Sequence, residues 1–288
     1  MQCSLDDSLG VADTEEVITA TEPLASFEVT RSRDGSECNE QDQLAEETPI
    51  ALIYNGISHA VMLATPQDLE DFALGFSLSE GIVLDKSELY SIEIQVQKNG
   101  IEIHCEIAGE RFAELKNHRR TLAGKTGCGL CGAESLAQAM RYPPKLQSPV
   151  LFERSAILGA LQMLPSYQKL QQKTGATHAS AWVLAEGTVT VVREDVGRHN
   201  ALDKLIGALA KLEPRGEGFI VTSSRASYEM VQKTASAGVN MLVAISAPTG
   251  LAVRIAEQCG LTLVGFARNK AYVVYSHPEQ INPTLIKN

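Results

Sequence analysis

The chain has 288 residues, of which 44% are hydrophobic and 21% charged, and its formal net charge is −10. This length and balance suit one large or two modest folded domains and exclude a wholly disordered chain. The sequence contains no run of 18 apolar residues, so no membrane-spanning helix is expected. Its first residues lack the basic segment and the apolar segment of a signal peptide, so none is expected. Six cysteines are too few for a disulfide scaffold, so we expect a cytoplasmic protein with no membrane partner.

The negative charge is concentrated at the start of the chain. Residues 1–48 contain thirteen acidic residues and two arginines, a net charge of −11, whereas the other 240 residues sum to +1. Residues 1–45 show no sustained helical or strand period apart from one candidate extended segment at Ser26–Arg31. We therefore predict an acidic flexible tail over residues 1–45, followed by a nearly neutral folded part that can accept anionic ligands.

The first folded part alternates strands with one helix. Asn-Gly pairs between apolar runs are strong hairpin signals, and Thr65-Pro66 has the residue types of a helix N-terminus. The predicted elements are strands at Pro49–Tyr54 and Ile57–Ala64, a helix from Thr65 to Gly81, and strands at Ser91–Gln97 and Ile101–Ile107. Residues 121–133 contain four glycines and predict a mobile loop, after which we expect a short helix at Glu134–Met140.

The second half alternates helices and strands regularly. Predicted helices are Glu153–Lys173, Ala201–Leu212, Tyr228–Ala237 and Leu251–Cys259, and predicted strands are Ala179–Ala185, Thr188–Arg193, Phe219–Thr222, Met241–Ile245, Leu261–Phe266 and Ala271–Tyr275. We place Trp182 in the core and expect Asp203 and Lys204 to face outward or pair with neighbours on their helix. Apolar β-branched runs between helices predict an α/β fold, a mixed sheet covered by helices. The predicted domains are an N-terminal α+β domain over residues 46–145 and an α/β domain over residues 146–288.

The sharpest chemical feature is the pair Cys128 and Cys131 in a glycine-rich loop. A structural zinc site needs four ligands, and the other four cysteines are scattered along the chain. Flanking glycines leave both sulfurs accessible, and Lys125 with successive backbone N–H groups can stabilise a thiolate. The pattern favours a reactive thiol that attacks, carries a group and hands it on, with no metal site.

A zinc-dependent hydrolase of the deaminase class is the main alternative. His104 and Glu106 precede the cysteine pair in an order similar to the zinc deaminase pattern. Gly127 stands where that pattern has proline, and the two residues lie on an alternating strand instead of at a helix start. A third hypothesis is a nucleotide-binding chaperone in which neither cysteine reacts.

Several loops of the second half carry groups that suit phosphates. Arg193–Asn200, Thr222–Arg225 and Ser246–Thr249 each lie where a predicted strand ends and a helix begins. Loops at the carboxyl ends of strands present hydroxyls, arginines and free N–H groups to anions. The turn at Phe266–Lys270 adds two cations and an aromatic ring. Taken together, these loops favour a site for a nucleotide, although each one alone is compatible with ordinary helix capping.

The sequence resembles the formate dehydrogenase accessory sulfurtransferases, the FdhD family, over about Thr48–Pro278. The motifs that carry the resemblance are TGCGLCGAESL, THASAW, EDVGRHNALDKLIG, SSRASYEMVQK and APTGLAVRIAEQCGLTLVGFAR. The N-terminal part is similar through NGISHAVMLATPQDLEDFALGFSLSEGIV. The resemblance implies a cytidine deaminase-like C-terminal domain and a smaller α+β N-terminal domain.

The resemblance also implies a sulfur carrier. A cysteine desulfurase would pass persulfide sulfur to Cys128, with Cys131 assisting transfer or resolving the persulfide. The sulfur would then reach the molybdenum of bis-molybdopterin guanine dinucleotide, the cofactor of formate dehydrogenase. The family implies a homodimer and no nucleic acid partner. The residues expected to bind this cofactor are Phe266, Ala267, Arg268, Asn269, Lys270 and Ala271, completed by Ser223, Ser224, Arg225, Asp195 and His199.

Overall fold

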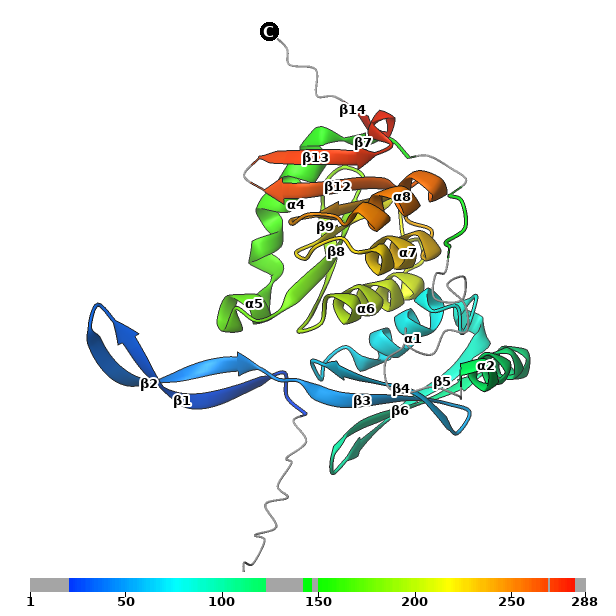
Figure 1. Ribbon diagram of the computed structural model, residues 1–288, viewed down its shortest axis with the longest axis horizontal. Coiled ribbons are helices and arrows are strands. Elements are labelled where there is room, and N and C mark those ends of the chain that lie inside the picture. Colours follow the sequence, from blue (N-terminus) through cyan, green and yellow to red (C-terminus); the bar gives the residue numbers. More distant parts are fainter. Residues whose placement is uncertain (1–20, 123–141, 147–149, 269, 283–288) are drawn as a thin grey trace, which may run out of the picture.

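The computed structural model describes residues 21–122, 142–146, 150–268 and 270–282. Over these ranges the chain forms a four-stranded sheet unit, a six-stranded sheet unit and a projecting two-stranded arm (Figure 1). The expected mixed α/β architecture is confirmed. The deaminase likeness and the domain boundaries stay predictions. No helix in the described ranges is long and apolar enough to span a membrane.

The first unit is a four-stranded sheet in the order β4-β3-β6-β5 with α1 packed on one face. Its elements are β3 (Thr48–Tyr54), β4 (Ile57–Ala64), α1 (Leu69–Ser79), the 3-10 helix η1 (Lys86–Glu88), β5 (Leu89–Gln97), β6 (Gly100–Ile107) and α2 (Gly109–Leu122). Alternate residues of β3 and β6, such as Leu52 and Ile103, are fully buried against Phe72 of α1. The predicted strands of this unit are confirmed, whereas α2 had no counterpart among the predicted elements.

The second unit is a six-stranded sheet in the order β13-β12-β11-β10-β8-β9. Its strands are β8 (His178–Leu184), β9 (Val189–Asp195), β10 (Gly218–Thr222), β11 (Met241–Ala244), β12 (Thr262–Arg268) and β13 (Ala271–Ser276). Its helices are α4 (Arg154–Tyr167), α5 (Lys169–Thr174), α6 (Arg198–Lys211), α7 (Tyr228–Ser236) and α8 (Gly250–Cys259), and β7 (Phe152–Glu153), η2 (Pro278–Gln280) and β14 (Ile281–Asn282) complete it. Helices α6, α7 and α8 share one core cluster with Trp182, while α4 covers the opposite face with Phe219 and Val243.

Helices α1 and α6 join the two units by an unusually close crossing (Figure 1). A Cβ placed on Gly75 would lie 1.7 Å from the Asp203 carbonyl oxygen, and one on Gly207 would lie 1.9 Å from the Asp71 carbonyl oxygen. Only glycine fits at either position. Each glycine costs about 1 kcal/mol of helix propensity, and the close backbone approach that it permits offsets this cost.

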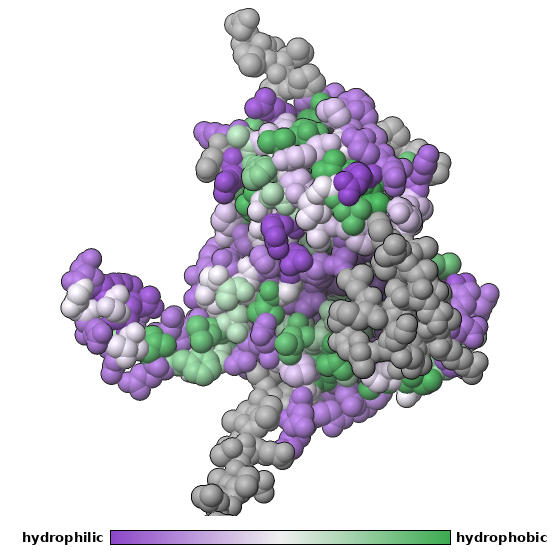
Figure 2. All heavy atoms as spheres, viewed as in Figure 1, coloured by the Kyte–Doolittle hydropathy of each residue, from purple (hydrophilic) through white to green (hydrophobic). Residues whose placement is uncertain are grey.

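The prediction of a flexible segment through residue 45 is wrong for residues 24–45. Strands β1 (Leu24–Arg33) and β2 (Ser36–Ala45) pair antiparallel in one continuous register and form the arm. Asp34 and Gly35 both have positive φ, the geometry of a tight hairpin turn, and Asp-Gly is a strong signal for that turn. Figure 2 shows hydrophilic residues around the tip of the arm and apolar residues where it meets the body of the protein.

Two helix predictions need correction. The helix expected over residues 153–173 is divided into α4 and α5, because the backbone leaves helical geometry at Gln168, which has φ −82° and ψ 73°. The helix expected from Thr65 begins at Leu69, after Asp68 in a left-handed conformation. Thr65 is instead fully buried and forms hydrogen bonds to the loop that follows β9.

Asp203 and Lys204 are also placed differently from the expectation. Both side chains are buried, and each makes an ion pair with a residue outside α6. Lys204 pairs with Asp195 at 2.7 Å, and Asp203 pairs with Lys233 at 3.0 Å. Trp182 is 1% exposed, so its predicted place in the core is confirmed.

Candidate functional site

The loops singled out in the second half meet at one edge of the six-stranded sheet. Strands β9, β10, β11 and β12 run in the same direction, because β8 is antiparallel to β9 and β10 while β11 is parallel to β10 and β12. Their carboxyl ends therefore lie side by side, and we call the loops that follow them the carboxyl-edge loops: residues 195–200, 223–227, 245–249 and 266–271. Backbone hydrogen bonds connect neighbouring loops, including Phe266 N–H to the Ser246 carbonyl at 3.1 Å.

The turn between β12 and β13 presents exposed cations and one exposed aromatic ring. Phe266 is 41% exposed with a positive φ, and Arg268 and Lys270 are also exposed. Ala267 is 1% exposed and packs in the core beneath α4, so its side chain is not accessible to a ligand. Ala271 pairs with Arg268 across the turn. Asn269 lies outside the described residues.

The two serines after β10 have different roles. The Ser223 hydroxyl accepts a hydrogen bond from the Ala179 amide at 2.9 Å and is half-buried. Ser224 is 3% exposed, and its hydroxyl donates to the Arg225 carbonyl at 2.9 Å. Ser224 therefore shapes the turn from inside, whereas Ser223 and the exposed Arg225 remain near the surface.

Asp195 does not have the direct binding role expected for it, because its carboxylate is fully buried. One oxygen accepts hydrogen bonds from Gly197 N–H at 2.7 Å and the Asn200 amide at 3.1 Å. The other accepts from Thr65 N–H at 3.0 Å and lies 2.7 Å from Lys204 Nζ. With both oxygens occupied by protein groups, Asp195 orients the loop that follows β9.

His199 lies on the first turn of α6 and faces α7. Its Nε2 is 2.8 Å from a Glu229 carboxylate oxygen and 3.4 Å from the Ser227 hydroxyl. The hydrogen bond from His199 lowers the pKa of Glu229, and the charge of His199 acts in the same direction. The imidazole is thereby held at the edge of the sheet with about a quarter of its side chain exposed.

Two residues of this edge were missed among the predicted binding residues. Arg198 begins α6, and its Nε is buried with no hydrogen-bond partner among the described residues. His178 begins β8 opposite Asp195, and burial lowers its pKa, with the charge of Arg198 acting in the same direction. The signal for Arg198 was its place as the first residue after a strand-to-helix loop, where a helix N-terminus adds positive potential.

An anionic ligand fits this arrangement. The orphaned Arg198 Nε lies at the N-terminus of a 14-residue helix. The loops that follow β10 and β12 at the same edge of the sheet expose Arg225, Arg268 and Lys270. Guanidinium groups and helix N-termini are the donors that phosphates prefer in proteins. The described residues of this edge thus suit an anionic group such as a phosphate.

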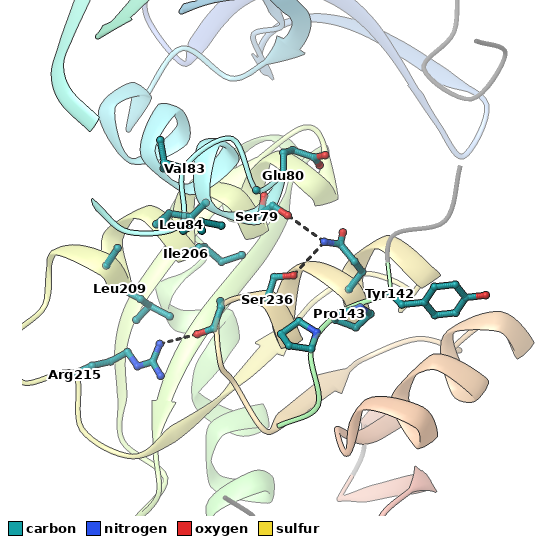
Figure 3. Close-up of a pocket in the computed structure, with 16 residues that line it drawn as sticks. Ser79, Glu80, Val83, Leu84, Tyr142, Pro143, Ile206, Leu209, Arg215 and Ser236 are labelled. Atoms are coloured by element: carbon teal, nitrogen blue, oxygen red, sulfur yellow. Dashed lines mark hydrogen bonds between the residues drawn. The ribbon is translucent and has the colours of Figure 1, made fainter. Parts of the chain in front are cut away.

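The predicted thiols Cys128 and Cys131, and the helix expected at Glu134–Met140, lie outside the described residues. The flanking segments are described: α2 ends at Leu122, and the chain continues at Tyr142. Tyr142 lines a cavity of about 430 Å³ together with residues from the ends of α1, α6 and α7 (Figure 3). Since α6 and α7 begin at the carboxyl-edge loops and this cavity adjoins their last turns, Tyr142 lies away from those loops. Tyr142 is the first described residue after the thiol segment, by which we mean residues 123–141.

Two polar side chains of this cavity, Gln232 and Arg215, already have protein partners. The Gln232 amide donates to the Ser79 carbonyl at 3.0 Å and to the Ser236 hydroxyl at 3.2 Å (Figure 3). Arg215 donates to the Ala237 carbonyl at 3.1 Å. The remaining wall is largely aliphatic, so the cavity offers mainly shape and apolar contact.

The residues of the zinc alternative do not converge in the part of the chain that the structure describes. His104 Nε2 is 3.0 Å from a Glu102 carboxylate oxygen on the partly exposed side of β6. Cys105 is buried on the other side, where burial raises its pKa to about 12. No cluster of three or more His, Cys, Asp or Glu side chains within the described ranges could hold a metal ion.

Comparison with known proteins shows the family to which the chain belongs. The FdhD/NarQ family model matches residues 45–282, and the chain belongs to this family. The chain is 58% identical over 258 residues to the sulfur carrier protein FdhD of Cupriavidus necator, covering 89% of this chain and 90% of that protein. It is 52% identical over 261 residues to the sulfur carrier protein FdhD of Bordetella petrii, covering 89% and 94%.

A solved structure supports the fold. A protein from Desulfotalea psychrophila, described as a candidate formate dehydrogenase accessory protein, superimposes with a TM-score of 0.69 at 23% identity. The match covers 90% of this chain and 99% of that one. At this level of identity the likeness establishes the shared fold, and the resemblance seen in the sequence motifs is confirmed by the family match.

Proposed function

We propose that this protein is a sulfur carrier that takes persulfide sulfur from a cysteine desulfurase and delivers it to bis-molybdopterin guanine dinucleotide for formate dehydrogenase. The names of the curated relatives support the sulfur-carrier part of this proposal, and the description of the Desulfotalea protein supports the link to formate dehydrogenase. The observation in this chain that carries the proposal is the buried Arg198 Nε at the carboxyl edge, which has no hydrogen-bond partner among the described residues.

The cofactor to be sulfurated is the substrate, and the carboxyl-edge loops are proposed to bind its guanine nucleotide end. Arg198 and the N-terminus of α6 suit its phosphates. Arg225, Arg268 and Lys270 are exposed cations on neighbouring loops. The exposed ring of Phe266 offers a flat apolar surface on which a base can stack.

The proposed sulfur transfer begins with the Cys128 thiolate. It attacks the terminal sulfur of the desulfurase persulfide, a new S–S bond forms on Cys128, and the desulfurase cysteine leaves as a thiolate. Cys131 then attacks the inner sulfur of the Cys128 persulfide. A Cys128–Cys131 disulfide forms, and the terminal sulfur leaves as sulfide to the bound substrate. The two cysteines are oxidised by two electrons while the transferred sulfur is reduced, and an external dithiol restores both thiols.

Mass spectrometry tests the acceptor directly. After incubation with a cysteine desulfurase and cysteine, the wild-type protein should gain about 32 Da, the mass of one sulfur atom. Cys128→Ala should lose this adduct, whereas Cys38→Ala, which removes an exposed cysteine of the arm, should retain it. A full adduct on the Cys128→Ala variant would exclude Cys128 as the necessary acceptor.

The alternative functions predict other results. A nucleotide-binding chaperone predicts that Cys128→Ala and Cys131→Ala leave formate dehydrogenase maturation intact. A zinc hydrolase predicts stoichiometric zinc that is lost in Cys128→Ala.

The expected homodimer and cytoplasmic location stay predictions, and light scattering of the purified protein tests the former.

A further inference from the structure

The first residues of α6 take part in a junction between the two sheet units. We define this junction as Thr65 from the end of β4, Asp195 from the end of β9, and Asn200 and Lys204 from α6. Thr65, Asp195 and Lys204 are each 0% exposed. Every one of these residues contacts at least one other by a hydrogen bond or ion pair. The junction is therefore a buried polar network, in which each member depends on the others.

The four-stranded unit supplies half of this network. Thr65 donates its N–H to Asp195 at 3.0 Å, and its carbonyl accepts from Lys204 Nζ at 2.8 Å. The Thr65 hydroxyl accepts from the Val196 N–H at 3.1 Å. The Leu63 carbonyl accepts from the Asn200 amide at 2.8 Å. A single short stretch at the end of β4 thus contacts both ends of the loop that carries Arg198 and His199.

Lys204 and Asp195 determine the conformation of that loop. Asp195 accepts from the Gly197 N–H and from Asn200, two residues that flank Arg198 and His199. Without Lys204, the Asp195 carboxylate would be an uncompensated buried charge, which is strongly unfavourable. To regain a favourable environment, the Asp195 carboxylate must move or become hydrated. Either change breaks its hydrogen bonds with Gly197 and Asn200.

We propose that Asp195 and Lys204 are positioning residues of the nucleotide site, and that docking of Thr65 from the four-stranded unit holds Arg198 in its ligand-binding orientation. This inference rests on the proposed function, since it assigns Arg198 to the phosphates of a guanine nucleotide. It gives the four-stranded unit, from which α2 leads to the thiol segment, a direct influence on the loops of the other unit.

The structure provides a matched control at the other end of α1. Lys233 of α7 is buried with 5% of its side chain exposed and pairs with Asp203 at 3.0 Å. It also donates to the Ser79 hydroxyl at 2.9 Å and to a Glu80 carboxylate oxygen at 2.7 Å, so, like Lys204, it contacts the four-stranded unit. Lys233→Met therefore removes the same kind of buried charge from the same pair of units without touching the loop after β9.

The experiment compares Lys204→Met with Lys233→Met in the full chain, using GDP as the probe in isothermal titration calorimetry. Both variants should unfold at a lower temperature than the wild type. Lys204→Met should weaken GDP binding about tenfold, the effect of one lost charge-assisted contact, while Lys233→Met stays within about twofold of wild type. Hydrogen exchange gives a second readout, in which the Val196 and Gly197 amides lose protection only in Lys204→Met.

Two milder substitutions test the same inference without removing a buried charge, in case the lysine variants do not fold. Thr65→Val keeps both backbone contacts and removes only the hydroxyl that accepts from Val196. Ser79→Ala removes the hydroxyl that accepts from Lys233 and donates to Asp203. Thr65→Val should weaken GDP binding about threefold and expose the Val196 amide, whereas Ser79→Ala should do neither. Wild-type affinity in Lys204→Met, or equal losses in the Lys204 and Lys233 variants, would overturn the inference. A wild-type protein that binds no GDP would overturn the proposed cofactor site itself, and unchanged exchange of Val196 and Gly197 in Lys204→Met would overturn the positioning role alone.

Discussion

Gly75 of α1 and Gly207 of α6 lie against one another: the Gly75 backbone nitrogen is 2.9 Å from the position that a Cβ on Gly207 would take. The two helices therefore contact through their backbones, and the sheet units are held at a separation that admits no side chain between these positions. The polar junction around Thr65 and the ion pair around Lys233 lie on either side of this contact along α1. These three features join the units, together with the ion pairs of Asp71 with Arg193 and Lys211.

Gly207→Ala should be severely destabilising. The new methyl group would lie 1.9 Å from the Asp71 carbonyl oxygen, which belongs to the backbone of α1 and cannot move away alone. We expect a loss of at least about 3 kcal/mol in the free energy of unfolding, measured by urea denaturation. Gly159→Ala is the control, because a Cβ at this position in α4 has no neighbouring atom within 4 Å. It should leave stability unchanged or raise it by up to about 1 kcal/mol. Equal effects of the two substitutions would contradict the close crossing.

Arg198→Ala should weaken GDP binding by about tenfold, because one charge-assisted contact to a phosphate is lost. The remaining binding should also depend less on salt concentration, since one fewer cation faces the ligand. Arg33→Ala, which removes an exposed cation of the arm, is the control and should bind GDP as the wild type does. Isothermal titration at two salt concentrations measures both effects. Unaltered affinity in Arg198→Ala would remove this residue from the site.

Deletion of residues 1–45 should leave GDP binding intact. The arm contacts the body at β3 and α5, and none of its hydrogen bonds involves the carboxyl-edge loops within the described ranges. Its removal also takes away most of the excess negative charge of the chain, so a modest gain in affinity for an anion is expected. Calorimetry with the shortened and the full chain gives the comparison. A large loss of affinity would mean that the arm contributes to the site.

The ion pair of His199 and Glu229 should make stability depend on acidic pH. The pKa of Glu229 in the folded protein is lowered from 4.5, so the pair stabilises the fold above the unfolded pKa and loses its effect as pH falls through the folded pKa. Because half of the Glu229 side chain is exposed, we expect only about 0.5 kcal/mol, which is lost as the pH falls below the unfolded pKa and through the lowered folded pKa. Glu229→Gln should lack this part of the pH dependence. Parallel pH profiles of wild type and variant in urea denaturation would argue against the pair.

Local patterns predicted most of the strands and helices, because apolar alternation and turn residues act over a few positions. The same signal was present at Asp34-Gly35, but the strongly acidic composition around it favoured an interpretation as a flexible tail. Pro165 lies near the end of α4, but the apolar residues around it recur at helical spacing and led to the prediction of one continuous helix.

The site was harder to assign, since residue types do not reveal burial. Asp195 and Lys204 look like surface residues in sequence, and only the packing of β4 against α6 converts them into a buried pair. Arg198 belongs to the same strand-to-helix loop as Asp195 but was not selected as a binding residue. That its buried Nε has no hydrogen-bond partner among the described residues can be seen only in three dimensions. Ser223 and Arg225 follow β10, and Phe266 with the two cations lies at the end of β12, so these residues share one edge because β10 and β12 run in the same direction. Their role in binding stays a prediction.

The most direct test of the account is the maturation of formate dehydrogenase in cells whose own copy of this protein has been deleted. Complementation with Cys128→Ala should yield formate dehydrogenase that contains molybdenum and guanine nucleotide but lacks activity, whereas Cys38→Ala should restore wild-type activity. Full formate dehydrogenase activity with Cys128→Ala would contradict a sulfur-carrying role and favour a chaperone without thiol chemistry.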